Sequence, residues 1–127
     1  MGYLIVFAGA GIGGALRHGV NLAAARMFGL GFPFGTIIVN VLGSFLLGVL
    51  AGYFAFRTGL PQHVRLFLTT GVLGGFTTFS AFSLDAALLM ERHAYWSAAA
   101  YMAGSVLLSL MALFAGLSLF RTGAILP

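Results

Sequence analysis

A polar side chain inside a long apolar stretch is the first feature of this sequence that could do chemistry. Asn40 lies within residues 35–44, a run that contains no charged residue. An amide buried in an apolar environment needs hydrogen-bond partners, and its two N–H donors could hold an anion. The same amide could instead form an interhelical hydrogen bond that only stabilises a helix bundle. Asn40 alone leaves both roles open.

A second chemical feature is the run Gly-Gly-Phe-Thr-Thr at residues 74–78. Glycine disfavours a helix, and threonine hydroxyls compete for backbone carbonyls, so this run predicts a local break. A break frees backbone N–H and C=O groups, which lipid tolerates only where they are buried in protein or line a cavity. Freed carbonyls suit cations and freed N–H groups suit anions. A simple kink that neighbouring helices repair is the alternative.

Two phenylalanines, Phe79 and Phe82, follow the predicted break and lie three residues apart, on one helical face. An aromatic ring has a positive edge and a negative face, so ring edges can stabilise a small anion. Such a site is weak enough for the ion to leave again, as conduction requires. The chain has 13 phenylalanines, however, and ordinary packing explains such a pair equally well.

The elements that must position these residues follow from composition. The 127 residues are 61% hydrophobic and 6% charged, against roughly 25% charged in a soluble domain. A helix that crosses a bilayer needs roughly 20 apolar residues. The spacing of the charges predicts four transmembrane helices in a single domain, 1–127, with the third helix broken mid-membrane. The predicted all-α spans are about 3–27, 35–57, 63–91 and 95–120.

Other classes are disfavoured by what the sequence lacks. The net charge is +4, but the arginines are scattered singly and form no basic patch, so we expect no nucleic-acid partner. There is no cysteine, and therefore no disulfide framework or thiolate metal site. The three histidines lie near predicted helix ends without metal-ligand spacing, so we expect no enzyme. A purely structural scaffold would not require Asn40 and a broken helix together.

The arginines near the span ends bear on orientation, because positive charge favours the cytoplasmic side. Arg57, Arg65 and Arg121 share one side, and Arg26 and Arg92 share the other. This small bias predicts that the chain inserts both ways and pairs antiparallel. A single orientation is the alternative.

Several glycines have the small-xxx-small spacing that lets helix backbones approach closely in lipid. Four helices make a thin bundle, so we expect an oligomer, and each glycine pair could serve either a dimer seam or packing within the chain. The pairs are Gly9 with Gly13, Gly48 with Gly52, and Gly71 with Gly75.

The sequence resembles the CrcB/Fluc family of fluoride channels. The resemblance rests on GGALR at 13–17, on GT(x3)N(x2)GS at 35–44 and, most specifically, on GGFTTFSAF at 74–82. It covers the first three helices, and chain length and helix count agree over the rest. It implies a multi-pass protein of the bacterial inner membrane that exports fluoride passively and so relieves fluoride toxicity. It also implies a dual-topology antiparallel homodimer with two pores, whose partners are fluoride and membrane lipid.

Site roles also follow from the resemblance. It implies that Phe79 and Phe82 line the fluoride path beside Asn40, and that a sodium ion on the twofold axis binds the backbone carbonyls of Gly74 and Thr77 from each subunit. Where many members have Thr, this chain has Ala81, which removes one hydroxyl from the polar track. The remaining expected pore residues are Thr78, Ser80, Ser83, Tyr101 and Ser109.

Two charged residues leave further alternatives open. Arg17 in the first helix could draw anions into a vestibule, or form a salt bridge at a helix end. Asp85 could pair with an arginine near that mouth. Asp85 is also the carboxylate nearest the membrane core, which a proton-coupled small multidrug exporter of dual topology would need. Fluoride is small and strongly hydrated and needs close donors, but selectivity over chloride rests on the resemblance.

Overall fold

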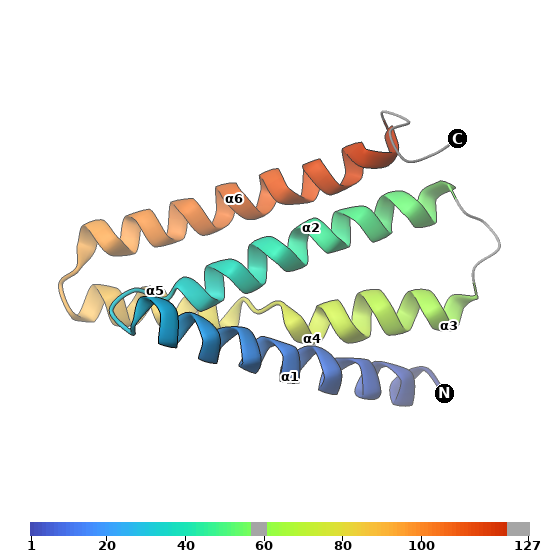
Figure 1. Cartoon of the computed structure of the whole chain (residues 1–127), viewed down its shortest axis with the longest axis horizontal. Helices are drawn as coiled ribbons and strands as arrows, with labels where there is room; N and C mark the ends of the chain where they lie inside the picture. Colours follow the sequence, from blue (N-terminus) through green and yellow to red (C-terminus); the bar gives the residue numbers. More distant parts are fainter. Residues whose placement is uncertain (57–60, 122–127) are drawn as a thin grey trace.

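The computed structural model describes residues 1–56 and 61–121, and every regular element in this part of the chain is helical (Figure 1). Four helical segments are long and apolar enough to cross a membrane, which makes the chain a multi-pass membrane protein. The predicted helix ends lie close to the observed ones, although Arg57 falls outside the described residues. The elements are α1 (Gly2–Phe28), α2 (Phe34–Phe56), α3 (Gln62–Arg65), η1 (Leu66–Leu73), α4 (Gly74–Phe76), α5 (Ser80–Glu91) and α6 (Tyr95–Arg121).

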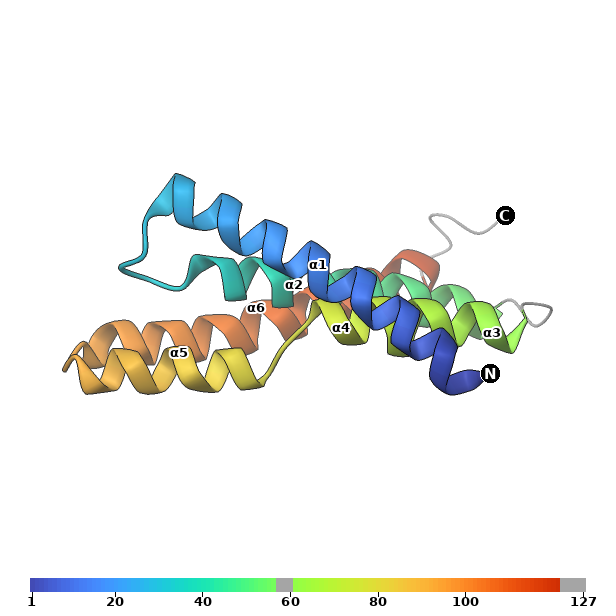
Figure 2. The same ribbon diagram turned by 90° about the horizontal axis from the view of Figure 1, so that it is seen from below.

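The third span is interrupted, as the Gly-Gly-Phe-Thr-Thr run predicts. Helices α3, η1 and α4 follow one another without a gap, and the chain then becomes extended at Thr77, with φ −83° and ψ 158°. Helix α5 begins at Ser80. Figure 2 shows this connection as a thin segment between α4 and α5. The break lies after the glycines and on the threonines.

The half of the third span before the break packs against α1 (Figure 2). A Cβ atom added at Gly9 would lie 2.8 Å from the Gly71 Cα, and one added at Gly75 would lie 2.8 Å from the Ala10 Cα. A Cβ at Gly13 would overlap the Val72 carbonyl. Four of the paired glycines, Gly9, Gly13, Gly71 and Gly75, therefore serve packing within the chain, where the two backbones touch.

The half after the break packs instead against α6 (Figure 2). Ala86 and Leu89 of α5 form a buried cluster with Ala98 and Tyr101 of α6, and Tyr101 is 0% exposed. The break thus transfers the third span from one neighbouring helix to another. The polar break itself lies against α2, where Gly43 faces Thr77 and Asn40 bonds Thr78.

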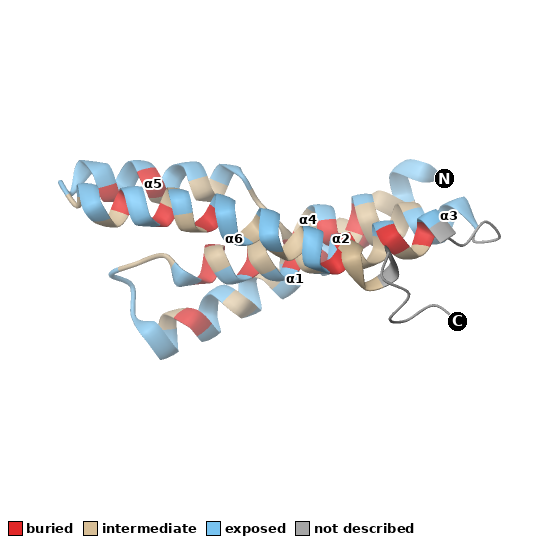
Figure 3. Ribbon diagram, turned by 90° about the horizontal axis from the view of Figure 1, so that it is seen from above, coloured by how far each residue is buried: buried red, intermediate tan, exposed pale blue. Residues whose placement is uncertain are grey.

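The long helices α2 and α6 complete the bundle. Gly48 of α2 lies against the carbonyl of Leu113, and a Cβ at Gly116 of α6 would lie 2.7 Å from the amide nitrogen of Val49. Buried residues follow the seams between helices, while the outward faces are exposed (Figure 3). Those exposed faces are largely apolar, which suits a chain whose solvent is lipid.

Candidate functional site

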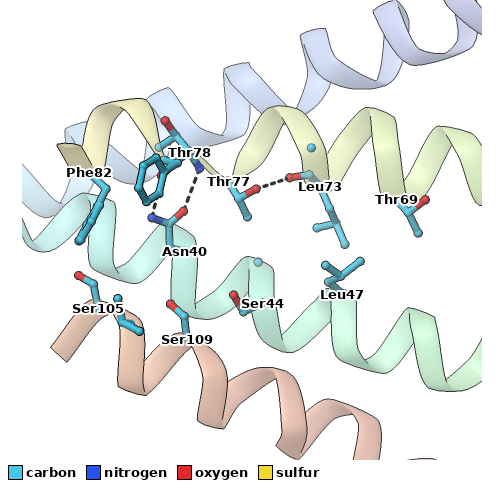
Figure 4. A pocket seen from close by; sticks show the side chains of 14 residues that line it. Asn40, Ser44, Leu47, Thr69, Leu73, Thr77, Thr78, Phe82, Ser105 and Ser109 are labelled. Atoms are coloured by element: carbon cyan, nitrogen blue, oxygen red, sulfur yellow. Dashed lines mark hydrogen bonds between the residues drawn. The ribbon is translucent and has the colours of Figure 1, made fainter. Parts of the chain in front are cut away.

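Asn40 of α2 is joined to the broken span by two hydrogen bonds (Figure 4). Its Nδ2 donates to the carbonyl of Thr78 at 2.9 Å, and the Thr78 amide donates to its Oδ1 at 2.9 Å. The side chain therefore pairs with the Thr78 backbone as another peptide group would. An amide has two N–H donors, so one remains for a further ligand. Both roles left open by the sequence can thus belong to the same side chain.

The hydroxyl of Thr78 supports the helix that follows. Its Oγ1 accepts a hydrogen bond from the amide of Ala81 at 3.1 Å and lies 3.3 Å from the Ser80 hydroxyl. A side-chain oxygen that accepts from an amide in the first turn satisfies a donor that the helix itself leaves unpaired. Thr78 consequently supports the first turn of α5 while α2 holds its backbone.

These side-chain bonds divert two amides from their usual carbonyls. In a continuous α-helix, each amide donates to the carbonyl four residues earlier. The amides of Thr78 and Ala81 would then donate to Gly74 and Thr77, but here they donate to Asn40 and to the Thr78 hydroxyl. The carbonyls of Gly74 and Thr77 are left without their helical donors. Such carbonyls can serve as ligands for a cation.

A cavity of about 540 Å³ lies beside the break and is lined by the broken third span, α2 and α6 (Figure 4). Its polar lining comes from three elements, and no charged residue is among the residues that line it. The rings of Phe79 and Phe82 complete it, and Phe79 is 77% exposed. The cavity therefore reaches the surface of the single chain. Its polar side chains include Asn40, Ser44, Thr78, Ser105 and Ser109.

The aromatic rings form a connected series. The Phe79 and Phe82 ring centroids are 5.5 Å apart, with planes at 40°. Phe82 stacks on Tyr101 at 5.3 Å and 29°, and Tyr101 meets Phe32 edge to face at 5.7 Å. Phe82 is thereby fixed by its neighbours, whereas Phe79 projects from the chain. The two rings are adjacent, as their spacing predicts.

Asp85 of α5 accepts hydrogen bonds from two hydroxyl groups. Thr36 Oγ1 donates to its Oδ2 at 2.7 Å, and the Tyr101 hydroxyl donates to the same oxygen at 3.0 Å. These bonds join α2, α5 and α6. Among residues 1–56 and 61–121, Asp85 therefore pairs with hydroxyl groups. The sequence had suggested an arginine as its partner.

Comparison with known proteins supports the resemblance. Residues 4–117 match the family described as CrcB-like protein, Camphor Resistance (CrcB). The chain belongs to the CrcB family. A relative from Rhodopseudomonas palustris (strain BisB5) is 59% identical over 95% of this chain and 98% of its own length. One from Methylobacterium nodulans is 61% identical over 93% and 94%, and one from Granulibacter bethesdensis is 61% identical over 96% of each chain. All three are named fluoride-specific ion channel FluC.

The other predicted site residues of this CrcB family chain lie in different surroundings. Ser109 lines the cavity, whereas Tyr101 is buried beneath Phe82 with its hydroxyl bound to Asp85. Ser83 is exposed, and its hydroxyl donates to the Phe79 carbonyl at 3.1 Å. Arg17 lies half-buried on α1 and does not line this cavity. The structure thus brings together Asn40, Thr78, Phe79, Phe82 and Ser109.

Sequence reasoning missed Ser105 of α6. It is 4% exposed, it lines the cavity, and its hydroxyl has no hydrogen-bond partner among the described residues. A buried polar atom without a partner requires an explanation, and a ligand is one. The sequence did contain a signal for Ser105. It lies four residues after Tyr101 and four before Ser109, so all three lie along one helical face.

Proposed function

We propose that this chain conducts fluoride passively across a membrane and thereby relieves fluoride toxicity. The observation that carries the proposal is the uncharged polar cavity at the helix break, lined by Asn40, Ser105 and Ser109 and by the rings of Phe79 and Phe82. Relatives that are 59% and 61% identical over nearly the whole chain bear the name of fluoride-specific ion channels, a non-enzymatic activity.

The lining fits the chemistry of a small, strongly hydrated anion. The free N–H of Asn40 and the hydroxyls of Ser105 and Ser109 can donate hydrogen bonds that replace water. The ring edges of Phe79 and Phe82 add weak positive potential. A site without fixed positive charge binds the ion loosely enough for release, which permits flow. We infer that fluoride passes along this series, with Thr78, Ser80 and Ser83 beside it.

A second copy of the chain would close the path. The cavity reaches the surface at Phe79, and its polar groups cannot be satisfied by lipid. The small charge bias between the two sides favours two orientations of one chain, hence an antiparallel homodimer with two pores in the inner membrane. Five arginines near the span ends give this charge bias, and one of them, Arg57, lies outside the described residues.

We also propose a sodium ion shared by the two copies. Gly74 is exposed and Thr77 is half-buried, and their carbonyls have lost their helical donors to Asn40 and Thr78. Unpaired carbonyls are costly within a bilayer unless they find a partner. A sodium ion would supply positive charge to the four carbonyls of two subunits. Arg17 remains our proposed residue of the vestibule.

No observation favours the small multidrug exporter. That mechanism needs a carboxylate that binds and releases protons in a substrate site, and the candidate, Asp85, is held by Thr36 and Tyr101 instead. Asp85 lines two smaller cavities and not the one at the break. The channel remains the function that the geometry supports best.

The test is fluoride efflux from liposomes that contain the purified protein, followed with a fluoride electrode. Valinomycin dissipates the voltage, and chloride release is recorded for comparison. We expect rapid fluoride release without chloride release. Phe79→Ile should slow it by about tenfold or more, a barrier increase of about 1.4 kcal/mol.

Phe7→Ile is the matched control, because Phe7 is a similarly exposed phenylalanine, 79% against 77%, on the outer face of α1. We expect this variant to release fluoride at the parent rate. Absence of fluoride release from the folded, reconstituted parent would overturn the proposed function. Equal slowing by both substitutions would overturn the aromatic path alone.

A further inference from the structure

Asn40 of α2 supplies hydrogen bonds to the interrupted helix at the break. The Thr78 peptide groups would be unpaired in a simple break, and unpaired peptide groups within a bilayer are strongly disfavoured. The Asn40 side chain satisfies both, accepting from the amide and donating to the carbonyl at 2.9 Å each. Without it, the Thr78 amide has an obvious alternative acceptor, which is the Gly74 carbonyl of a continuous helix.

We propose that Asn40 is a positioning residue for the break, which keeps the Gly74 carbonyl available to a cation by withholding the Thr78 amide from it. The inference rests on the sodium site of the proposed function and deepens it. The role differs from donation to fluoride, since it uses the Oδ1 and only one of the two N–H groups. The second N–H stays available to an anion.

Thr78 keeps a helical donor away from the Thr77 carbonyl, as Asn40 does for the Gly74 carbonyl. Its Oγ1 accepts from the Ala81 amide, which in a continuous helix would donate to Thr77. The hydroxyl of Thr77 does not compensate, because it donates to the Leu73 carbonyl at 3.0 Å. Two different side chains, Asn40 of α2 and Thr78, thus keep the helical donors away from these two carbonyls.

The packing of α2 against the break supports this assignment. Gly43 lies three residues after Asn40, and a Cβ there would overlap the Thr77 methyl group and lie 3.3 Å from the Phe76 ring. The missing side chain lets the broken segment lie directly on α2. That close approach places the Asn40 amide within reach of the Thr78 backbone.

The experiment measures sodium binding and amide exchange rather than conduction. Radioactive sodium binding to the purified full-length protein is titrated without fluoride, and hydrogen exchange of residues 76–81 is followed by mass spectrometry. We expect Asn40→Ala to accelerate exchange in this segment and to weaken sodium binding about tenfold or more, as loss of two hydrogen bonds implies. A residue that only contacts fluoride would change neither quantity.

Asn21→Ala is the matched control, because it removes the same amide from α1, where Asn21 lies against Gly35 of α2 and not against the Thr78 backbone. We expect it to leave sodium affinity and exchange at the parent values. Parent-like sodium affinity in Asn40→Ala, or a parent that binds no sodium, would overturn the inference. Fluoride efflux of the parent is recorded separately, so that failure of the channel function and failure of the positioning role are distinguishable.

A second pair of variants tests the proposal independently, in case Asn40→Ala does not fold. Thr78→Val keeps the shape of the side chain but removes the acceptor of the Ala81 amide, whereas Thr78→Ser keeps the hydroxyl. We expect Thr78→Val to weaken sodium binding about tenfold and Thr78→Ser to leave it unchanged. Equal affinities in the two variants would overturn the proposal that side chains hold these carbonyls free.

Discussion

The two halves of the third span are held by different means. Before the break, η1 and α4 lie on α1 through direct backbone contact, with glycines facing each other. After the break, α5 lies on α6 through side chains, with a buried tyrosine and a carboxylate that joins three helices. The first half depends on the absence of side chains and the second on their specific groups. We therefore expect the two halves to respond to different substitutions.

The largest effect should come from filling the glycine seam. A Cβ at Gly13 would overlap the Val72 carbonyl and lie 2.7 Å from the Phe76 amide nitrogen. Both are backbone atoms, so α1 and the third span must separate, and we expect Gly13→Ala to cost about 3 kcal/mol or more of unfolding free energy. Denaturant unfolding of the purified protein measures this.

Gly14→Ala is the control for that experiment. Gly14 is the next residue of α1, but a Cβ there would meet no atom within 4 Å. Alanine also favours a helix over glycine by about 0.5–1 kcal/mol, so this variant should be as stable as the parent or slightly more stable. Equal destabilisation by the two variants would contradict the backbone contact seen at Gly13.

A moderate effect should come from the hydroxyls around Asp85. Tyr101→Phe keeps the ring that stacks on Phe82 but removes a donor to a carboxylate. Hydrogen bonds to charged groups contribute about 1.5–3 kcal/mol. We therefore expect the free energy of unfolding to fall by an amount of that order, and thermal unfolding measures the change. Tyr3→Phe, at a tyrosine that is 95% exposed, should leave stability unchanged. A Tyr101→Phe variant as stable as the parent would show that the Tyr101 hydroxyl does not stabilise the second half.

The smallest effect on stability should come from Ser105. Its buried hydroxyl lacks a partner among the described residues, so Ser105→Ala removes an unsatisfied group. We expect the free energy of unfolding to stay within about 1 kcal/mol of the parent or to rise, while fluoride efflux falls. Liposome efflux and unfolding of the same preparation measure both quantities. A variant with unchanged efflux would show that the ion does not use this hydroxyl.

Local patterns in the sequence predicted the break and its aromatic pair, because both depend on residues close together in the chain. Phe79 and Phe82 are adjacent as their three-residue spacing requires, and the chain leaves the helix at the threonines that follow the glycines. The partners across the site were not predictable in this way. Asn40 and Thr78 lie 38 residues apart, and Thr36 and Asp85 lie 49 apart.

The glycines illustrate the same limit. Their spacing was compatible with a dimer seam or with packing inside the chain, and a spacing cannot identify the opposite helix. The structure places Gly9, Gly13, Gly71 and Gly75 in contacts within the chain. Lipid-facing and core-facing positions of a membrane helix are both apolar, so hydrophobic periodicity gives little guidance about which face is packed.

The sequence by itself determined that the chain has four segments long and apolar enough to cross a membrane, because 61% of its residues are hydrophobic and the few charges separate long apolar stretches. It also predicted a break in the third span, with a repaired kink as the alternative, since glycine and threonine weaken a helix locally. Only the tertiary structure decided what the freed backbone groups bind. The Asn40 amide and the Thr78 hydroxyl pair with some of these groups and leave the carbonyls of Gly74 and Thr77 without their helical donors, and such pairings depend on three-dimensional proximity.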